Sequence, residues 1–262
     1  MNTELHPRIK EIIQLYQDHV NKYKPGLLEG FYIYGSIAMG DYSLELSDID
    51  FIAITNERLS KSDIEAFNQM HQKIEKQYKK PNFNGIYVTW NDLGKLPNEV
   101  EPYPYYMDGI MHEAGYFEMN LVTWYELKQF GIAIIGPNAQ DLDFTVHWEH
   151  LITKMHENLN SYWKKWLSKS TFYIRGTDIE WGVLGVTRLF YTFREHGITT
   201  KAQAGDYALQ VVPKQFHKIL EESIHIRRQK KGSLYRSIIK RKHDANQYMK
   251  YIMDECDKMA KS

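Results

Sequence analysis

The clearest chemistry in this sequence lies in two aspartates, Asp48 and Asp50, which are separated by one residue and lead into an apolar run. Alternate side chains of an extended strand share a face, so both carboxylates would point the same way while Ile49 and Phe51 point into the core. Carboxylate oxygens are the ligands that Mg²⁺ prefers, and paired aspartates can hold one or two such ions. The spacing therefore indicates a divalent-metal site.

A Gly-Ser pair ahead of the aspartates adds a means of binding phosphate. Gly35 and Ser36 follow a short apolar run, and residues 36–40 would open a short helix. Backbone N–H groups after Gly35 and the Ser36 hydroxyl can hold phosphate oxygens, with the positive end of the helix facing them. The turn and the two carboxylates together predict a site for a metal ion and a phosphate.

The composition excludes several classes of protein. The chain has 262 residues, 43% of them hydrophobic and 14% aromatic, so it can form two globular domains with cores of their own. Its 33 basic and 33 acidic residues give a formal charge of zero, which argues against a nucleic-acid partner. The single cysteine, Cys256, excludes an intramolecular disulfide and a cysteine zinc site.

The N-terminus and the hydropathy indicate where the protein works. The first residues lack the apolar core of a signal peptide, and no segment approaches the roughly eighteen apolar residues of a membrane span. We therefore expect a soluble cytoplasmic protein with no membrane partner, present as a monomer or a weak dimer.

Periodicity predicts that strands and helices alternate in the first half and so position the aspartates. Helices are expected at residues 7–22, from residue 60 or 62 to about 80, and from residue 120, with strands at 28–34, 51–55, 85–90 and 131–135. Residues 62–65 resemble a capping box, and His71 should lie on the surface of its helix. The proline-rich residues 96–106 are predicted to form a loop, either beside the site or as a plain connector.

After residues 136–138 the apolar residues recur only with the period of a helix. Helices are predicted at residues 147–169, 180–196, 201–209, 214–229 and about 234–259. The basic run at residues 227–231 is expected to be a solvated face, with a minority alternative in which one or two of its cations close over phosphate. We predict an α+β protein: a mixed sheet with flanking helices in residues 1–137, then an all-helical domain in 138–262. Two such lobes would leave a cleft for ligands.

Three patterns carry a resemblance to known families. Gly35-Ser36, Gly40 and the Ser47-Asp48-Ile49-Asp50 run resemble the signature of the polymerase-β-type nucleotidyltransferases. The helix and Gly-bounded strand that end in Gly-Pro, and an arginine-containing helix followed by Thr-Lys-x-x-Ala-x-x-Tyr-Ala, are similar to the streptomycin/spectinomycin adenylyltransferases. The resemblance covers about residues 30–229.

This resemblance implies an enzyme, an aminoglycoside O-adenylyltransferase. It would transfer AMP from ATP to a hydroxyl of an aminoglycoside or aminocyclitol antibiotic, spectinomycin or streptomycin, release pyrophosphate and give resistance. Asp48 and Asp50 would be catalytic and hold two Mg²⁺ ions. The implied nucleotide-binding residues are Gly35, Ser36, Ser47 and Lys201. Lys201 would reach the triphosphate; the alternative is a solvated lysine at a helix N-terminus, which the helix dipole disfavours.

Asn84 departs from the family pattern. The resemblance puts a third carboxylate at this position, beside the acceptor hydroxyl, but an amide cannot act as a general base. Three explanations remain open. The chain is a natural variant whose base is Glu113 or Glu118, or Asn84 replaces an aspartate to trap substrates, or the alignment is displaced by a residue or two. Asn84 is retained with the two aspartates as a catalytic position.

A polycationic acceptor would require carboxylates and aromatic faces. The candidates are Glu113, Glu118, Asp178 and Glu180, with Trp181 as a stacking surface. The expected partners are thus ATP and a small cationic antibiotic, without nucleic acid. Two alternatives stay open: a nucleotide-binding protein with little transferase activity because of Asn84, and a nucleotidyltransferase that acts on a protein or an RNA.

Overall fold

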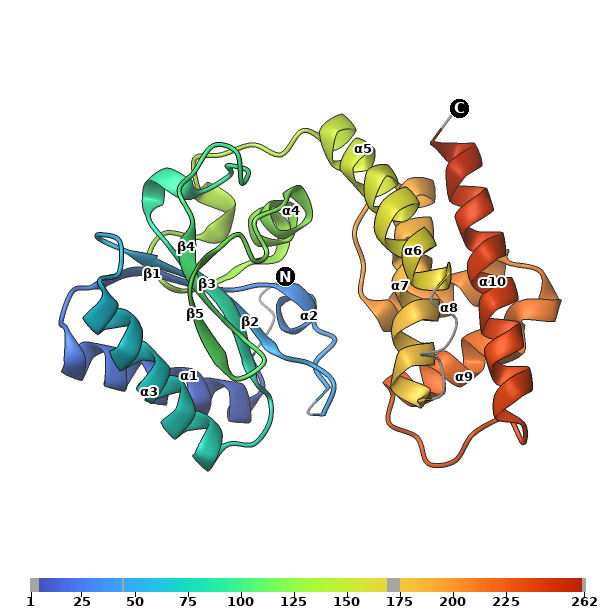
Figure 1. Cartoon of the computed structure of the whole chain (residues 1–262), viewed down its shortest axis with the longest axis horizontal. Helices are drawn as coiled ribbons and strands as arrows, with labels where there is room; N and C mark the ends of the chain where they lie inside the picture. The colour runs from blue at the N-terminus through green and yellow to red at the C-terminus, as the bar shows by residue number, and fades with distance from the viewer. Residues whose placement is uncertain (1–4, 44, 169–174, 261–262) are drawn as a thin grey trace. The chain divides into compact units, whose positions relative to one another are not determined.

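The chain divides into two compact units, Met1–Val146 and His147–Ser262. The computed structural model describes residues 5–43, 45–168 and 175–260 (Figure 1). The division falls later than the seam predicted after residue 137, because the next residues still pack on the first unit. Ala139 and Leu142 are buried in its core, and the ring of Phe144 contacts Trp124.

A six-stranded sheet with the spatial order β5-β4-β3-β2-β1-β6 forms the centre of the first unit. The strands are β1 Leu28–Ile33, β2 Ile49–Thr55, β3 Phe83–Val88, β4 Tyr103–Met107, β5 Ile110–Gly115 and β6 Ile132–Ile135. Strands β2 and β3 are parallel, and the other neighbouring strands are antiparallel. The mixed sheet predicted from the sequence is therefore confirmed.

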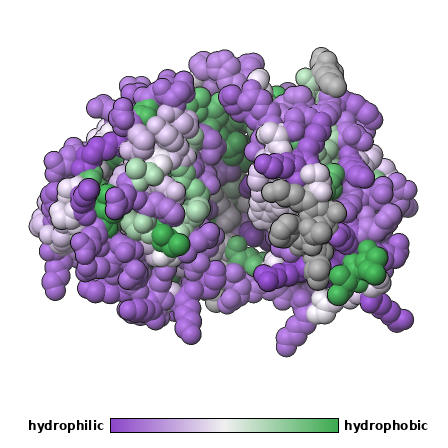
Figure 2. Space-filling model, in the orientation of Figure 1, coloured by the Kyte–Doolittle hydropathy of each residue, from purple (hydrophilic) through white to green (hydrophobic). Residues whose placement is uncertain are grey.

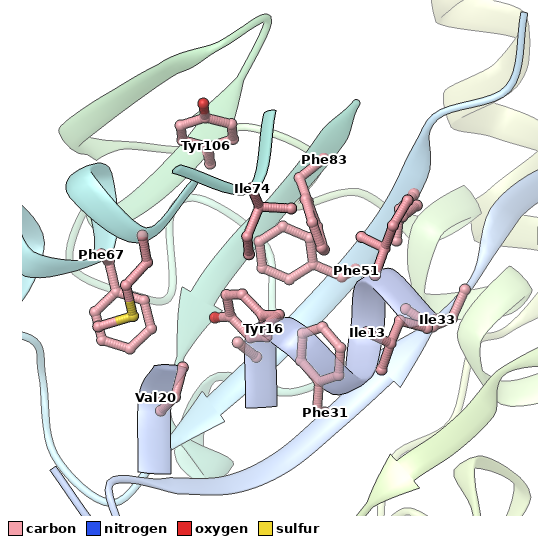
Figure 3. Close-up of a cluster of buried hydrophobic side chains, with 14 of the residues drawn as sticks. Ile13, Tyr16, Val20, Phe31, Ile33, Phe51, Phe67, Ile74, Phe83 and Tyr106 are labelled. Carbon is pink, nitrogen blue, oxygen red and sulfur yellow. The ribbon is translucent and has the colours of Figure 1, made fainter. Parts of the chain in front are cut away.

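Helices cover both faces of this sheet and bury different side chains of each strand. They are α1 Pro7–Tyr23, α2 Gly35–Ala38, α3 Lys61–Gln77 and α4 Leu121–Phe130, with 3₁₀ turns at Trp90–Asp92 and Ala139–Asp141. Under α1 and α3 lies an aromatic core that includes Tyr16, Phe51 and Phe83 (Figure 3). On the other face Ile52 packs in the core that contains Trp124 of α4. Strand β2 is buried on both faces, which explains its nearly continuous apolar sequence.

Helix α3 differs from the prediction in two details. The capping box joins Ser60 and Asp63, two residues earlier than predicted, with the Ser60 N–H donating to Asp63 Oδ2 at 2.9 Å. His71 is buried instead of exposed: its ring stacks on Tyr106 at 3.9 Å, and its Nε2 lies 2.5 Å from the Tyr87 hydroxyl. Burial lowers the pKa of His71 to about 3, so it packs in the core as a neutral ring.

The β4–β5 hairpin was missed, and the loop predicted over residues 96–106 is wrong from Tyr103 onwards. Pro104 is tolerated in β4 because the pairing with β5 shifts between Tyr103 and Tyr105, so no regular ladder bond is needed there. The hairpin turns at Asp108 and Gly109, whose φ angles of 51° and 80° are those that a two-residue type I′ turn requires. This Asp-Gly pair was the signal in the sequence that could have revealed it.

The described residues of the second unit form helices and no strand, as predicted for an all-helical domain. They comprise α5 Trp148–Asn158, a π-helical segment Leu159–Trp163, α6 Lys164–Ser168, α7 Gly176–Glu195, α8 Lys201–Val211, a 3₁₀ turn Lys214–Phe216, α9 His217–Arg227 and α10 Ile238–Met259. Lys169, the last residue of one predicted helix, lies outside the described residues. Helix α7 is central, because α8, α9 and α10 all pack against it.

Hydrophilic residues cover most of the face seen in Figure 2. The exposed apolar exceptions in the second unit include Leu234, Ile238 and Ile239 around the start of α10. Within the described part of the chain, the helices are too short or too polar to cross a lipid bilayer.

Candidate active site

Asp48 and Asp50 lie at the beginning of β2, where both side chains are half-buried. Ile49 and Phe51, which alternate with them, are fully buried in the core under α1 and α3. Because alternate residues of a strand share a face, the two carboxylates belong to the opposite face, the one that α4 covers. The alternation expected from the sequence is present.

The turn after β1 brings its backbone against Asp50. Gly35 has a φ of +67°, and a Cβ atom on it would lie 2.4 Å from Asp50 Oδ2. The backbone N–H of Tyr34 also donates to the Asp50 carbonyl at 3.0 Å. Only glycine combines this left-handed conformation with so close an approach, so Gly35 is needed to hold the carboxylate beside the turn.

Ser36 and Ser47 are joined by their hydroxyl groups. Ser36 Oγ donates to Ser47 Oγ at 3.3 Å, and Ser47 Oγ also accepts from the Ser43 N–H at 2.9 Å and donates to the Asp41 carbonyl at 3.4 Å. Ser47 is 2% exposed. Since its hydroxyl is occupied by protein groups, Ser47 fastens the loop before β2 to α2, and its direct contact with a nucleotide stays a prediction.

Asn84 lies directly beside the aspartates. Parallel pairing of β2 and β3 aligns it with Asp50, and its Nδ2 donates to Asp48 Oδ2 at 3.0 Å. Its Oδ1 accepts from the backbone N–H of Asp108, at the tip of the β4–β5 hairpin, at 3.1 Å. This geometry favours the alignment that put Asn84 at the family's third position over one displaced by a residue or two.

Glu113 and Glu118, the alternative bases, lie in different surroundings. Glu113 is exposed on the edge strand β5, with β4 between it and β3. Glu118 has a φ of +55° and accepts from Thr123 Oγ1 at 2.9 Å. Burial raises the pKa of Tyr34 well above its usual value, and the charges of Glu118 and then Asp50 add to this effect. The charges of Glu118 and Asp50 thus act on the same buried side chain, Tyr34, whereas no such effect of Glu113 is found.

The donor atoms around β2 fit magnesium. Among the described residues no group of three or more His, Cys, Asp or Glu side chains is arranged to hold a metal ion, and Asp48 and Asp50 offer a pair of carboxylates. Mg²⁺ commonly takes one or two protein carboxylates and completes its coordination with substrate phosphates and water. A carboxylate pair beside a glycine turn therefore fits a Mg²⁺ ion that arrives with a nucleotide.

Lys201 begins α8 and lies in a buried ionic cluster of the second unit. Its Nζ is 3.5 Å from Glu180 Oε1, and Arg227 Nη1 is 3.8 Å from the same oxygen. The side chains of Lys201, Glu180 and Arg227 are 17%, 7% and 8% exposed. Arg227 is thus buried, although the sequence predicted a solvated face for the basic run that it begins.

The surroundings of Lys201 favour an anion. Burial lowers the pKa of Lys201 to about 8; the charge of Glu180 opposes this shift, and the charges of Arg188 and Arg227 reinforce it. Burial is the largest cause of this shift, and the cluster sets the cations of Lys201, Arg227 and Arg188 against the carboxylate of Glu180. A phosphate group bound here would relieve the repulsion.

The predicted acceptor-binding residues of the second unit have unequal access to a ligand. Glu180 is buried against Lys201 and Arg227, so a cationic acceptor would compete with the protein's own cations. Asp178 is half-buried in the first turn of α7 and makes no hydrogen bond or ion pair with a described residue. Trp181 belongs to an aromatic cluster, and Lys201 Nζ lies 5.9 Å from its ring centre. The other rings of the cluster are Tyr162, Trp163 and Trp166.

Comparison with known proteins agrees with both halves of the structure. Residues 145–255 match the family described as aminoglycoside adenylyltransferase, C-terminal domain. The chain resembles the aminoglycoside adenylyltransferases. Its fold is also similar to that of a crystal structure of spectinomycin adenyltransferase AAD(9) from Enterococcus faecialis with ATP and spectinomycin, with a TM-score of 0.72, 14% identity, and coverage of 95% of this chain and 99% of that chain. No curated protein matches the chain in sequence.

The resemblance found in the sequence is therefore confirmed. The family match covers the helical unit with Glu180, Lys201 and Arg227, and the structural match shows the fold of the whole chain. Together they support an enzyme of the nucleotidyltransferase class.

Proposed function

We propose that this protein transfers AMP from ATP to a hydroxyl group of an aminoglycoside or aminocyclitol antibiotic, spectinomycin or streptomycin, with release of pyrophosphate. One observation carries the proposal: Asp48 and Asp50 share a strand face against the Gly35 turn, in a chain whose helical unit matches the adenylyltransferase family. The similar fold described with ATP and spectinomycin supports these two substrate classes. Such a modification of the drug in the cytoplasm would confer resistance.

The residues of the first unit would bind the reacting end of the nucleotide. Asp48 and Asp50 would hold Mg²⁺, which when bound neutralises phosphate charge and favours in-line displacement of pyrophosphate. Helix α2 has only four residues, so phosphate oxygens would be bound by the first N–H groups after Gly35 and by the Ser36 hydroxyl instead of by a long helix dipole.

The residues of the second unit would provide positive charge and acceptor contacts. Lys201 would bind the triphosphate, because the charges of Arg227 and Arg188 also act at this position beside the single carboxylate of Glu180. Glu180 would orient Lys201 through their ion pair. Asp178 is the better candidate for a cationic acceptor, because it makes no ion pair with a described residue, and the ring of Trp181 would add an aromatic face beside it.

The test is pyrophosphate release from Mg-ATP with spectinomycin, with streptomycin and without a drug. We expect drug-dependent release, loss of release when Mg²⁺ is chelated, and a product heavier than one of the drugs by one adenylyl group. If ATP binds but neither drug is modified, the antibiotic assignment is wrong.

A nucleotide-binding protein with little transferase activity is the second candidate. It is favoured by Asn84, which puts an amide 3.0 Å from Asp48 where the family resemblance expects a carboxylate. This candidate predicts Mg-ATP binding, measured by titration calorimetry, without pyrophosphate release from any acceptor, including protein and RNA.

A further inference from the structure

We propose that Asp108, at the tip of the β4–β5 hairpin, supplies the carboxylate that β3 lacks at Asn84 and takes the proton from the acceptor hydroxyl. This inference rests on the proposed function and names the base for the same reaction.

The amide of Asn84 joins the aspartates to the hairpin tip. It donates to Asp48 Oδ2 at 3.0 Å and accepts from the Asp108 N–H at 3.1 Å. The Asp108 carboxylate belongs to the residue whose N–H is bound, so bond lengths keep it within roughly 7 Å of the Asn84 amide oxygen. One acceptor hydroxyl that lies between the Asp108 carboxylate and the Asn84 amide can contact both groups.

An amide is the side chain that can make both of these bonds. A carboxylate at position 84 could accept from the Asp108 N–H, but it could not donate to Asp48, and two carboxylates so close would repel each other. Asn84 is therefore a positioning residue, which holds the hairpin tip beside the aspartates.

The Asp108 side chain is not fixed by a polar contact with the described residues. It is exposed, and its carboxylate makes no hydrogen bond or ion pair with any described residue. The type I′ turn requires a residue at position 108 that tolerates a positive φ. Asparagine meets this requirement as well as aspartate does, so the turn does not explain the carboxylate. Glu118, by contrast, already accepts a hydrogen bond from Thr123 in the first turn of α4.

The proton transfer completes the reaction without another reactant. As the acceptor oxygen attacks the α-phosphorus, its proton passes to the Asp108 carboxylate and the new O–P bond forms. The bond from the α-phosphorus to the bridging oxygen breaks, and pyrophosphate leaves with that electron pair.

The first test is Asp108→Asn in the full chain, which keeps the turn and removes the charge. We expect kcat to fall about 10²- to 10³-fold, the usual contribution of a general base, while the Kd for Mg-ATP and the thermal unfolding midpoint change little. Glu101→Gln, the same change at an exposed residue before β4, is the matched control and should keep the wild-type rate. An Asp108→Asn variant with a wild-type kcat would overturn the inference.

A second variant separates charge from geometry. Adding Asn84→Asp to Asp108→Asn returns a carboxylate to the site, and we expect at least a tenfold recovery of kcat. No recovery with intact ATP binding would mean that Asp108 acts through the hairpin and not through its charge.

A third measurement does not depend on activity. Asn84→Ala should accelerate amide hydrogen exchange at Asp108, and unchanged exchange would remove the positioning role of Asn84. If the wild-type chain modifies no drug, the proposed function fails and the base assignment fails with it. If the wild type is active and Asp108→Asn is equally active, only the base assignment fails.

Discussion

The acidic site of the first unit and the cationic cluster of the second differ in how their charges are accommodated. Asp48 and Asp50 are half-buried carboxylates, whereas the side chains of Lys201 and Arg227, 17% and 8% exposed, lie against the buried Glu180. Half-buried carboxylates stay hydrated without a ligand, but buried cations lose hydration and need a counter-ion inside the protein. Changes in the first unit should therefore affect catalysis, and changes in the second should affect stability as well.

The largest effect is expected for Asp50→Asn. Under the proposed function, loss of one of the two carboxylates that would hold Mg²⁺ removes several kcal/mol of transition-state stabilisation, so adenylyl transfer should fall on the order of 10⁴-fold. The unfolding free energy should change by less than about 1 kcal/mol, because Asp50 is half-buried. Pyrophosphate release and chemical denaturation measure the two quantities, with the exposed Asp143→Asn as control. Retained activity would show that the acidic site is not catalytic.

Glu180→Gln should have the largest effect on stability. The change leaves Lys201 and Arg227 buried without their shared carboxylate, and breaking such a pair costs about 3–5 kcal/mol. Asp178→Asn, in the same helix but without an ion pair to a described residue, should cost less than about 1 kcal/mol. Equal denaturation midpoints for the two variants would show that the ion pairs of Glu180 do not stabilise the second unit.

Lys201 should make stability depend on pH. Its pKa is lowered from 10.5 to about 8 in the folded protein, so between these values the unfolded chain binds a proton that the folded chain has released. Unfolding free energy should therefore rise with pH from about 8 to 10.5, by roughly 3 kcal/mol at most, while Mg-ATP affinity falls over the same range. Denaturation and calorimetry of Lys201→Met should show neither dependence. The same pH slope in that variant would contradict the assignment.

The smallest effect compares two glycines in the first unit. Gly26→Ala and Gly35→Ala place a side chain at φ angles of +77° and +67°, and each should cost about 1–2 kcal/mol. At Gly26 nothing lies within 4 Å of the new Cβ, whereas at Gly35 the Cβ meets Asp50 Oδ2 at 2.4 Å. Only Gly35→Ala should therefore also slow adenylyl transfer, and equal rates for the two variants would show that the Asp50 contact is unimportant.

Local patterns in the sequence predicted most of the elements. The helical periods of α1, α4, α7 and α8, and the alternation of Ile49 and Phe51 with the aspartates, depend on neighbouring residues only. Strand β4 was missed despite the Asp108-Gly109 turn signal, and the burial of His71 could not be predicted from neighbouring residues. Pro104 argues against a strand until its opposite position in β5 is known to be irregular, and His71 is neutral only because aromatic rings surround it.

The carboxylate pair, the Gly35-Ser36 turn and the order of an α/β half followed by a helical half can be predicted from spacing along the chain alone. The contacts by which Asn84 joins Asp48 to Asp108, and by which Lys201 lies with Glu180 and Arg227, are seen only in the folded protein. These contacts join segments that are far apart in sequence, and their distances follow from strand pairing and helix packing, which no local pattern records.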